Sequence, residues 1–406
     1  MTEAYLDRVQ QTLRMLGIPA WLLYNFRDSN PIATRILGMP ADTHQTRRWA
    51  YLIPAQGEPR GLTHRIEPHI GRNMIGRTIE YSSHEEFLDG LGALLKGLPV
   101  VAMEYSPRNA IPVISRVDAG TIELVRSLGV EVVASGALIA HLEAVLTEEQ
   151  IASALRAGVG VRETMMSAFR FIRERIGSGT PVNEYDVQQE ILREFGRRGL
   201  VTDHSPNCSV GANSANPHYE PTAEQSSPIV NGDFVLIDLW GREKSSDAVF
   251  GDITWVGYVG RSVPERYRKI FRIVRDARDA AFNHVRDAFA ASEGITGADL
   301  DRSARAVIED AGYGEQFVHR TGHSITTELH GAGANLDSFE TDDTRPILPG
   351  TSFSIEPGIY LPGDFGIRSE LDVVIGFDRS VVATSDPVQQ DVIAICGENG
   401  AIPASC

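Results

Sequence analysis

Four segments of the chain each place an acidic residue inside an apolar run rich in β-forming side chains. The segments are FVLIDLWG (234–241), DITWVGYVG (252–260), TSFSIEPGIYL (351–361) and GIRSELDVVIG (366–376), and the acidic residues are Asp238, Asp252, Glu356 and Glu370. A buried carboxylate is costly unless it is paired, hydrogen-bonded or bound to a metal ion. A single case is commonly a solvent-facing or salt-bridged residue, but four cases predict a common site.

A cluster of histidines lies between the second and third of these segments. The stretch HRTGHSITTELHG (319–331) holds His319, His323 and His330, three of the 11 histidines in the chain. Four carboxylates that converge would repel one another, and two divalent cations would offset that repulsion. Carboxylates with one imidazole suit Mn²⁺, with Zn²⁺, Co²⁺ or Fe²⁺ as alternatives. Two such ions can hold a bridging hydroxide as nucleophile and polarise a carbonyl group.

Other metal and nucleotide patterns are weak or absent. The H-x-x-x-H spacing has no C-x-x-C before it, and Gly322 beside Thr321 disfavours a helix there. The H-E-x-x-H pattern of zincins does not occur. The G-A-G at 331–333 is too short for a nucleotide fingerprint and is interpreted as a loop. Taken singly, an acidic residue or a histidine is more often a surface or satisfied core group, so the order of the motifs carries the prediction.

The elements that must position these residues follow a segment of different character. Residues 20–25, 49–55 and 99–105 are predicted strands and 3–17 and 84–97 predicted helices, which indicates an α/β layer. Thr147 and Gln150 then form a capping-box pattern that opens a long helix reaching Gly177. We therefore predict a smaller domain over 1–143 and a catalytic domain over 147–406.

Further helices are expected in the second domain. One starts at Asn183, one runs from Ser262 to about 291 with Pro264 and Glu265 in its first turn, and one begins near Thr296. The four acidic segments are the predicted strands between and after them.

Composition limits the classes of function. The chain has 406 residues, enough for two domains, and 38 basic against 54 acidic side chains give a net charge of −16. That balance argues against a nucleic-acid or anionic-membrane partner. Cys208, Cys396 and Cys406 are too few and too far apart for a disulfide framework. Without a signal-peptide pattern or an apolar run of roughly 18 residues, we expect a cytoplasmic protein.

Five motifs in order resemble those of a known family. They are NSANPHY (213–219), LIDLWG with GDIT (236–254), HRTGH with LH (319–330), SIEPGIY (354–360) and GIRSELDVVI (366–375). They resemble the pita-bread metallopeptidases, and most closely the Xaa-Pro branch, prolidase and aminopeptidase P. The resemblance covers 145–395 and, more weakly, the N-terminal domain shared with creatinase. It implies an α+β protein in which an antiparallel sheet flanked by helices, the pita-bread fold, follows a smaller α/β domain.

The resemblance also implies a set of metal ligands. Asp238 would chelate one ion through both oxygens, and Asp252 and Glu370 would bridge two ions. His323 and Glu356 would hold the other ion, and Glu356 would also shuttle the proton of the metal-bound water. The expected cofactor is a pair of divalent ions, Mn²⁺ first, with Zn²⁺ or Co²⁺ as alternatives.

Four further residues acquire catalytic roles through the same resemblance. His330 would donate a hydrogen bond to the scissile carbonyl oxygen or its oxyanion. His319 would line the substrate pocket, and His218 would assist the leaving imide nitrogen of proline. Arg368 would orient Glu370 or contact a substrate carboxylate.

Two departures from the family pattern affect this assignment. Asp238 and Asp252 are fourteen residues apart, whereas eleven is usual, so the turn GREKSSDAVFG is longer and Asp247 becomes a rival for the second aspartate. Asp252 is preferred because Ile253 and Thr254 follow it as in the family. Trp255 stands where an arginine commonly follows the threonine, which puts in doubt a contact behind the ligands.

The expected function is hydrolysis of the peptide bond that precedes proline, by an Xaa-Pro dipeptidase or an Xaa-Pro aminopeptidase. The partners would be a proline-containing di- or oligopeptide substrate and a second subunit in a homodimer, and the compact chain favours the dipeptidase. One alternative is a metal-dependent hydrolase of a small non-peptide amide on the same fold. Another is a non-catalytic binding module, for which degenerate ligands or acidic tails would be expected. A creatinase-like, metal-independent enzyme should have lost acidic ligands, and this chain has them.

Overall fold

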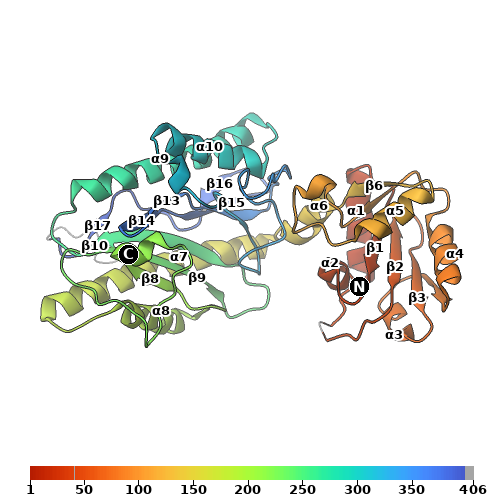
Figure 1. Cartoon of the computed structure of the whole chain (residues 1–406), viewed down its shortest axis with the longest axis horizontal. Coiled ribbons are helices and arrows are strands. Elements are labelled where there is room, and N and C mark those ends of the chain that lie inside the picture. The colour runs from red at the N-terminus through yellow and green to blue at the C-terminus, as the bar shows by residue number, and fades with distance from the viewer. Residues whose placement is uncertain (41, 398–406) are drawn as a thin grey trace. The chain divides into compact units, whose positions relative to one another are not determined.

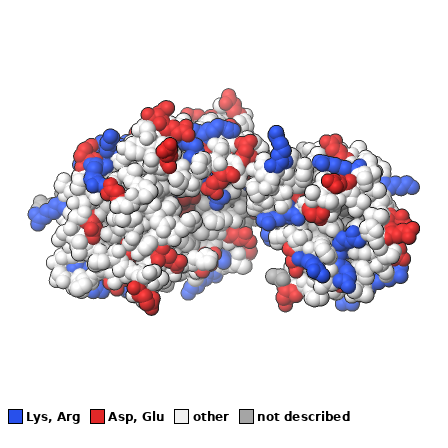
Figure 2. Space-filling view, in the orientation of Figure 1, with Lys and Arg blue, Asp and Glu red and all other residues white. Residues whose placement is uncertain are grey.

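The computed structural model describes residues 1–40 and 42–397. The chain divides into two compact units, the first spanning Met1–Leu142 and the second beginning at Glu143. Lys and Arg side chains lie among Asp and Glu side chains over the visible face of each unit (Figure 2). Within the described ranges, no helix combines the length and the apolar character that crossing a membrane requires.

The first unit is built on a six-stranded sheet in the order β4-β3-β2-β1-β5-β6 (Figure 1). Its strands are β1 (Ala20–Asn25), β2 (Trp49–Pro54), β3 (Arg60–His64), β4 (Arg77–Tyr81), β5 (Val100–Met103) and β6 (Glu131–Ala134). Its helices are α1 (Glu3–Met15), α2 (Pro31–Ile36), α3 (Pro68–Gly71), α4 (His84–Leu95), α5 (Ala119–Ser127) and α6 (Gly136–Ile139), with the short turn η1 (Pro107–Asn109). The turn η2 (Ala140–Ala144) spans the boundary between the units. The predicted strands and helices of this segment are confirmed, and β1 is buried along its whole length.

The second unit opens with two helix pairs separated by strands. Its helices are α7 (Glu148–Ser178), α8 (Glu184–Arg198), α9 (Glu265–Ala291) and α10 (Gly297–Asp310), with η3 (Gly211–Ala215) and η4 (Gly314–Gln316). Thr147 and Gln150 form the predicted capping box, and Asn183 and Thr296 cap α8 and α10. The expected start at Ser262 is wrong, because α9 begins at Glu265, directly after its N-cap Pro264. Pro264 keeps an extended backbone there, with φ −60° and ψ 143°.

In the part of the second unit that the structure describes, three sheets lie between the helix pairs (Figure 1). One follows the order β17-β10-β9-β7, with β8 also paired to β9, another the order β11-β12-β15-β16, and β13 pairs with β14. The strands are β7 (Leu200–Val201), β8 (Asn207–Val210), β9 (Phe234–Glu243), β10 (Gly251–Tyr258), β11 (Ser324–Ile325), β12 (Ser352–Ile355), β13 (Gly358–Leu361), β14 (Phe365–Arg368), β15 (Leu371–Ile375), β16 (Val381–Ala383) and β17 (Ile393–Ala394).

Two of the predicted strands are each broken at an acidic residue. The segment 351–361 divides into β12 and β13 at Glu356 and Pro357, and the segment 366–376 divides into β14 and β15 at Ser369 and Glu370. Pro357 has no N–H to continue a ladder. At the second break the chain changes partner from β13 to β12. Glu356 and Glu370 therefore stand at strand ends, where their side chains are not confined to one pleated row.

The cysteines carry no structural cross-link among the described residues. Cys208 is a buried free thiol and Cys396 a half-buried one. The third cysteine of the sequence, Cys406, lies outside the described residues.

Candidate metal centre

The ladder of β9 and β10 places two aspartates on one face. Asp238 lies opposite Thr254, and Asp252 lies opposite Trp240 in the antiparallel register. Cross-strand partners share a face, and so do residues two apart, so Asp238, Asp252 and Thr254 point the same way. The alternate residues Ile237, Ile253 and Trp255 face the other side, where they pack in the core that α7 and α8 cover.

The longer turn between these strands does not disturb this arrangement. The ladder runs unbroken from Gly241 opposite Gly251 to Phe234 opposite Tyr258, so the extra residues lie beyond its end. Asp247 sits in that turn and is exposed, whereas Asp252 is 5% exposed. The geometry therefore favours Asp252 over Asp247 as a member of the site.

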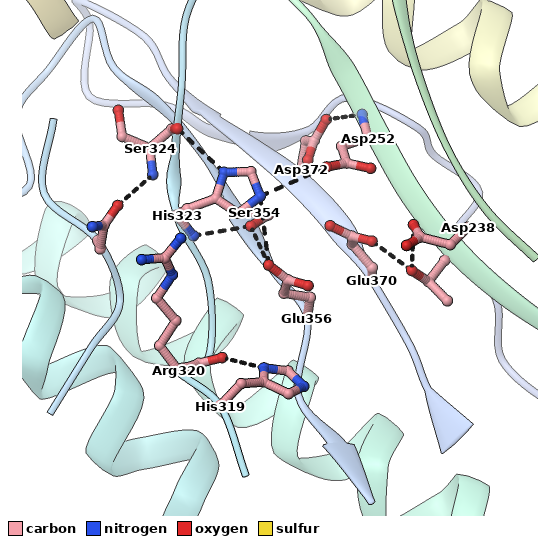
Figure 3. A network of polar contacts seen from close by, with 12 residues as sticks. Asp238, Asp252, His319, Arg320, His323, Ser324, Ser354, Glu356, Glu370 and Asp372 are labelled. Carbon is pink, nitrogen blue, oxygen red and sulfur yellow. Dashed lines mark hydrogen bonds and ion pairs between the residues drawn. The ribbon is translucent and has the colours of Figure 1, made fainter. Parts of the chain in front are cut away.

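The second side of the site comes from the β12–β15 ladder and the loop before β11. Asp252, His323 and Glu370 each offer an atom within 4.8 Å of the others. His323 Nε2 lies 3.6 Å from Asp252 Oδ2 and 3.5 Å from Glu356 Oε1. Figure 3 shows these side chains and Asp238 directed toward a common space between the strands. The structure thus brings all five expected ligands together.

Hydrogen bonds fix the orientation of the histidine. His323 Nδ1 lies 3.3 Å from the carbonyl oxygen of Ser324, so this nitrogen carries the hydrogen and Nε2 keeps its lone pair. The backbone N–H of His323 donates to Ser354 Oγ at 3.0 Å, and Ser354 Oγ donates to Glu356 Oε1 at 3.2 Å. His323 is therefore presented to the carboxylates by the nitrogen that can bind a metal ion.

Thr254 and Arg368 connect the carboxylates of the other half. Thr254 Oγ1 lies 2.9 Å from Asp238 Oδ1 and 2.7 Å from Glu370 Oε2, and it accepts from Arg368 Nε at 2.9 Å. Arg368 also forms an ion pair with Asp238. Thr254 was noted in the sequence only because it follows Asp252, but the structure makes its hydroxyl the bridge between two expected ligands.

The electrostatics of the site favour a cation. Burial, with the repulsion of neighbouring carboxylates, raises the pKa of Asp252 and Glu370 well above their usual range. Burial also raises the pKa of Asp238 to about 6, although Arg368 opposes it. Asp252 Oδ1 and Glu370 Oε1 are buried without a hydrogen-bond donor. Hard oxygen ligands with lone pairs free and one imidazole fit a divalent ion.

Glu356 differs from the other carboxylates. Burial raises its pKa, but His323, Arg368, His319 and Arg320 outweigh that effect and leave the pKa below its usual value. Because burial lowers the pKa of His323 as well, the permanently charged Arg368 is the dependable counter-charge. Its Nε lies 3.7 Å from Glu356 Oε2. Glu356 is therefore the expected carboxylate ligand whose pKa the surrounding charges lower rather than raise.

The sequence interpretation missed a fifth buried carboxylate, Asp372. Its Oδ2 accepts the Asp252 N–H at 2.6 Å, its Oδ1 has no donor, and burial raises its pKa. Asp372 follows Glu370 by two residues and lies on β15, opposite Ser354 of β12 (Figure 3). That spacing within an apolar run was the available signal.

The remaining expected histidines occupy different positions. The His330 ring meets the His323 ring edge-on at a centroid distance of 4.3 Å, and burial lowers its pKa to about 4. His319 Nε2 lies 2.8 Å from the hydroxyl of Tyr360, which also accepts from Arg368 at 3.2 Å. Tyr360 was part of a quoted motif but was not selected as a site residue.

His218, like His330, is an expected residue that the structure leaves exposed. Its backbone N–H donates to Asn216 Oδ1 at 3.1 Å. Glu184 holds the loop that carries His218. Its carboxylate accepts from the neighbouring Tyr219 hydroxyl at 2.5 Å and from the Asn213 amide at 2.8 Å. The role of His218 stays a prediction.

Comparison with known proteins gives a consistent result. Residues 149–376 match the model of metallopeptidase family M24. An Xaa-Pro dipeptidase of Lactobacillus delbrueckii subsp. lactis is 30% identical over 238 residues, which are 57% of each chain. A probable dipeptidase PepE of Mycobacterium bovis is 27% identical over 366 residues, 89% of each chain.

The similarity to solved structures extends over both units. The crystal structure of dipeptidase PepE from Mycobacterium ulcerans superposes with a TM-score of 0.67 at 22% identity and covers 97% of both chains. This likeness shows the fold and confirms the expected α+β class with a pita-bread catalytic unit. The match to the Lactobacillus protein spans only 57% of that relative's length.

Proposed function

The chain belongs to metallopeptidase family M24, and from that premise we propose that it is a metal-dependent peptidase that hydrolyses the bond preceding proline. The observation that carries the proposal is the convergence of Asp252, His323 and Glu370 within 4.8 Å, with one buried oxygen on each of the two carboxylates lacking a donor. The relative from Lactobacillus delbrueckii is named an Xaa-Pro dipeptidase, which supports the same substrate class here.

Five side chains would hold the metal ions. They are Asp238, Asp252, His323, Glu356 and Glu370, and the expected ions are two of Mn²⁺, with Zn²⁺ or Co²⁺ as alternatives. When bound, such ions offset the carboxylate charge, turn water into a nucleophile at neutral pH and polarise the substrate carbonyl. Thr254 and Arg368 would keep Asp238 and Glu370 in place through the hydrogen bonds already described.

Glu356 is the general base of the proposed reaction. Its pKa lies below the usual range, so it can accept a proton from the attacking water at neutral pH. Its side chain is 16% exposed, against 7% for Asp252, so it borders the space that the substrate enters. The same proton then passes to the proline nitrogen, which leaves as a secondary amine.

The histidines assist the substrate rather than the ions. His330 would donate an N–H to the carbonyl oxygen as negative charge develops on it. With its pKa near 4, the ring is neutral and keeps one N–H for this purpose. His319 would line the pocket, where Tyr360 holds its ring, and His218 would approach the leaving nitrogen from its exposed loop.

A hydrolysis assay tests the proposal directly. The purified protein is stripped with a chelator, reloaded with Mn²⁺ and given Ala-Pro and Ala-Pro-Ala in parallel. Glu370→Ala should abolish cleavage, whereas Glu104→Gln, which alters a buried carboxylate of the first unit, should not. Cleavage that needs the metal ion supports the Xaa-Pro function, and the preferred peptide separates a dipeptidase from an aminopeptidase.

The second candidate function is hydrolysis of a small non-peptide amide at the same site. It is favoured if the protein binds Mn²⁺ but cuts neither peptide.

We propose, further, a domain division at 1–143 and 147–406, a homodimer and a cytoplasmic location. Light scattering of the purified protein would measure the mass of the assembly.

A further inference from the structure

A buried ion pair on α10 lies behind the histidine segment of the site. Arg305 Nε and Nη2 each lie 3.1 Å from an oxygen of Asp301, one helical turn earlier. Asp301 is 0% exposed and Arg305 is 8% exposed. A buried pair of this kind loses hydration that its mutual attraction only partly restores, so it is weak evidence for a stabilising role. What else the two side chains bind is therefore informative.

Both side chains direct their remaining hydrogen bonds to the segment that carries His319 and His323. Asp301 Oδ1 accepts from the Thr321 N–H at 2.9 Å and from the Thr321 hydroxyl at 2.6 Å. Arg305 donates to the carbonyl of Phe317 at 3.1 Å and to the carbonyl of His319 at 2.8 Å. The segment is thus held at every second residue between 317 and 321.

Other contacts hold the Asp301 and Arg305 side chains in place. Asp301 Oδ2 accepts from both the N–H and the hydroxyl of Ser338, at 3.1 Å and 2.6 Å. The Arg305 guanidinium lies over the rings of Phe317 and Phe339, at 4.1 Å and 4.4 Å from their centroids. Neither side chain can shift without breaking contacts on several sides.

Thr321 transmits this position to the metal centre. Its N–H and hydroxyl bind Asp301, while its carbonyl accepts the Glu356 N–H at 2.7 Å. The next residue, Gly322, passes so close to β12 that an added Cβ would lie 2.0 Å from the Ser354 carbonyl oxygen. His323 follows, hydrogen-bonded through its N–H to Ser354 Oγ. Thr321 therefore links the Asp301–Arg305 pair to two expected ligands, directly to Glu356 and through Gly322 to His323.

We propose that Asp301, Arg305 and Thr321 form a positioning clamp that sets the separation of His323 and Glu356 for metal binding. The proposal rests on the metal-dependent function proposed above. None of the three is an expected metal ligand or substrate contact, so they are positioning residues. Loosening the clamp should weaken metal binding by about tenfold or more, the usual effect of supports behind ligands.

The test compares three variants, of which the two threonine-to-valine changes are isosteric. Thr321→Val removes the hydroxyl that binds Asp301 but keeps the shape of the side chain, and Thr321→Ser restores the hydroxyl. Thr164→Val is the matched control, because Thr164 is also 0% exposed and its hydroxyl binds a carbonyl, that of Gly160 at 2.9 Å, within α7. Each protein is titrated with Mn²⁺ by calorimetry, and its thermal unfolding is measured without metal.

The clamp predicts that Thr321→Val loses Mn²⁺ affinity by about tenfold while Thr321→Ser and Thr164→Val bind as the wild type does. If Thr321→Val unfolds like Thr164→Val and binds Mn²⁺ with unchanged affinity, the clamp is only structural and the proposal is overturned. If Thr321→Val is too unstable to measure, Asp301→Asn and Arg305→Lys take its place under the same criterion. Because the readout is metal affinity, a wild type that cuts no proline peptide would refute the proposed function without affecting this result.

Discussion

Replacing Glu104 by glutamine should remove a pH dependence of stability from the first unit. Glu104 is fully buried, and its carboxylate accepts from Trp21 Nε1 at 2.6 Å, Asn30 Nδ2 at 2.7 Å and Ser135 Oγ at 3.1 Å. None of these donors is charged. Burial therefore outweighs the hydrogen bonds and raises the pKa of Glu104 from 4.5 to about 7.

The raised pKa sets the sign of the effect. The folded protein binds this proton more tightly than the unfolded chain does. The resulting stabilisation is fully present below pH 4.5 and is lost as the pH rises through about 7. The change in pKa corresponds to about 3 kcal/mol of unfolding free energy. Solvent does not screen this carboxylate and so does not reduce the effect, because the residue is 0% exposed.

Urea unfolding of the wild type and of Glu104→Gln at about pH 5, 6, 7 and 8 measures this contribution. The amide keeps an acceptor for Trp21 but turns its NH₂ toward the amide of Asn30, which adds an offset that does not vary with pH. The stability of the wild type relative to the variant should fall by about 2 to 3 kcal/mol across this range. Other titrating groups are common to both proteins and cancel in the difference.

A constant difference between the two proteins would refute the reasoning. It would mean that the three neutral donors stabilise the ionised carboxylate enough to cancel the effect of burial. Glu104 would then be ionised at pH 5 and would contribute no slope.

Four further outcomes concern the site. Asp252→Asn should lose bound Mn²⁺ while Asp247→Asn keeps it, as elemental analysis of the purified variants would show; the reverse would place the exposed turn residue in the site. His330→Ala should keep its metal but lose roughly 10²–10³ in kcat, the usual effect of one oxyanion donor, and unchanged kinetics would return it to a structural role. Metal affinity should weaken as the pH falls through about 6, because Asp238, whose pKa is about 6, and Asp252 and Glu370, whose pKa values are also raised, must be free of protons to bind ions. Calorimetry in two buffers of different ionisation enthalpy would detect the released protons, and no proton release at pH 6 would contradict this expectation. Gly322→Ala should reduce both stability and metal binding, because its Cβ would lie 2.0 Å from the Ser354 carbonyl oxygen. A Tm equal to that of the wild type would show that β12 can move away from the added Cβ.

The residue types and the order of the motifs were enough to identify the family and to select the acidic residues and His323. A carboxylate in an apolar run is conspicuous, because burying it requires a compensating partner. Helix starts at Asn183 and Thr296 were equally readable, since capping depends on side chains a few residues apart. These signals depend on residues close together in the chain, so they can be recognised without knowledge of the fold.

The tertiary structure determined which distant residues meet and which side chains share a face, and the local sequence does not contain this information. Only the register of β9 against β10 shows that Asp252 shares a face with Asp238 while Asp247 lies beyond the ladder. The breaks at Glu356 and Glu370 depend on a change of strand partner, which the apolar pattern does not record. Asp372, Tyr360 and Asp301 acquire their roles from groups distant in the chain, such as the Asp252 N–H, 120 residues from Asp372. The sequence by itself determined which chemical groups the site contains, and the packing of the two ladders and α10 determined where each group points.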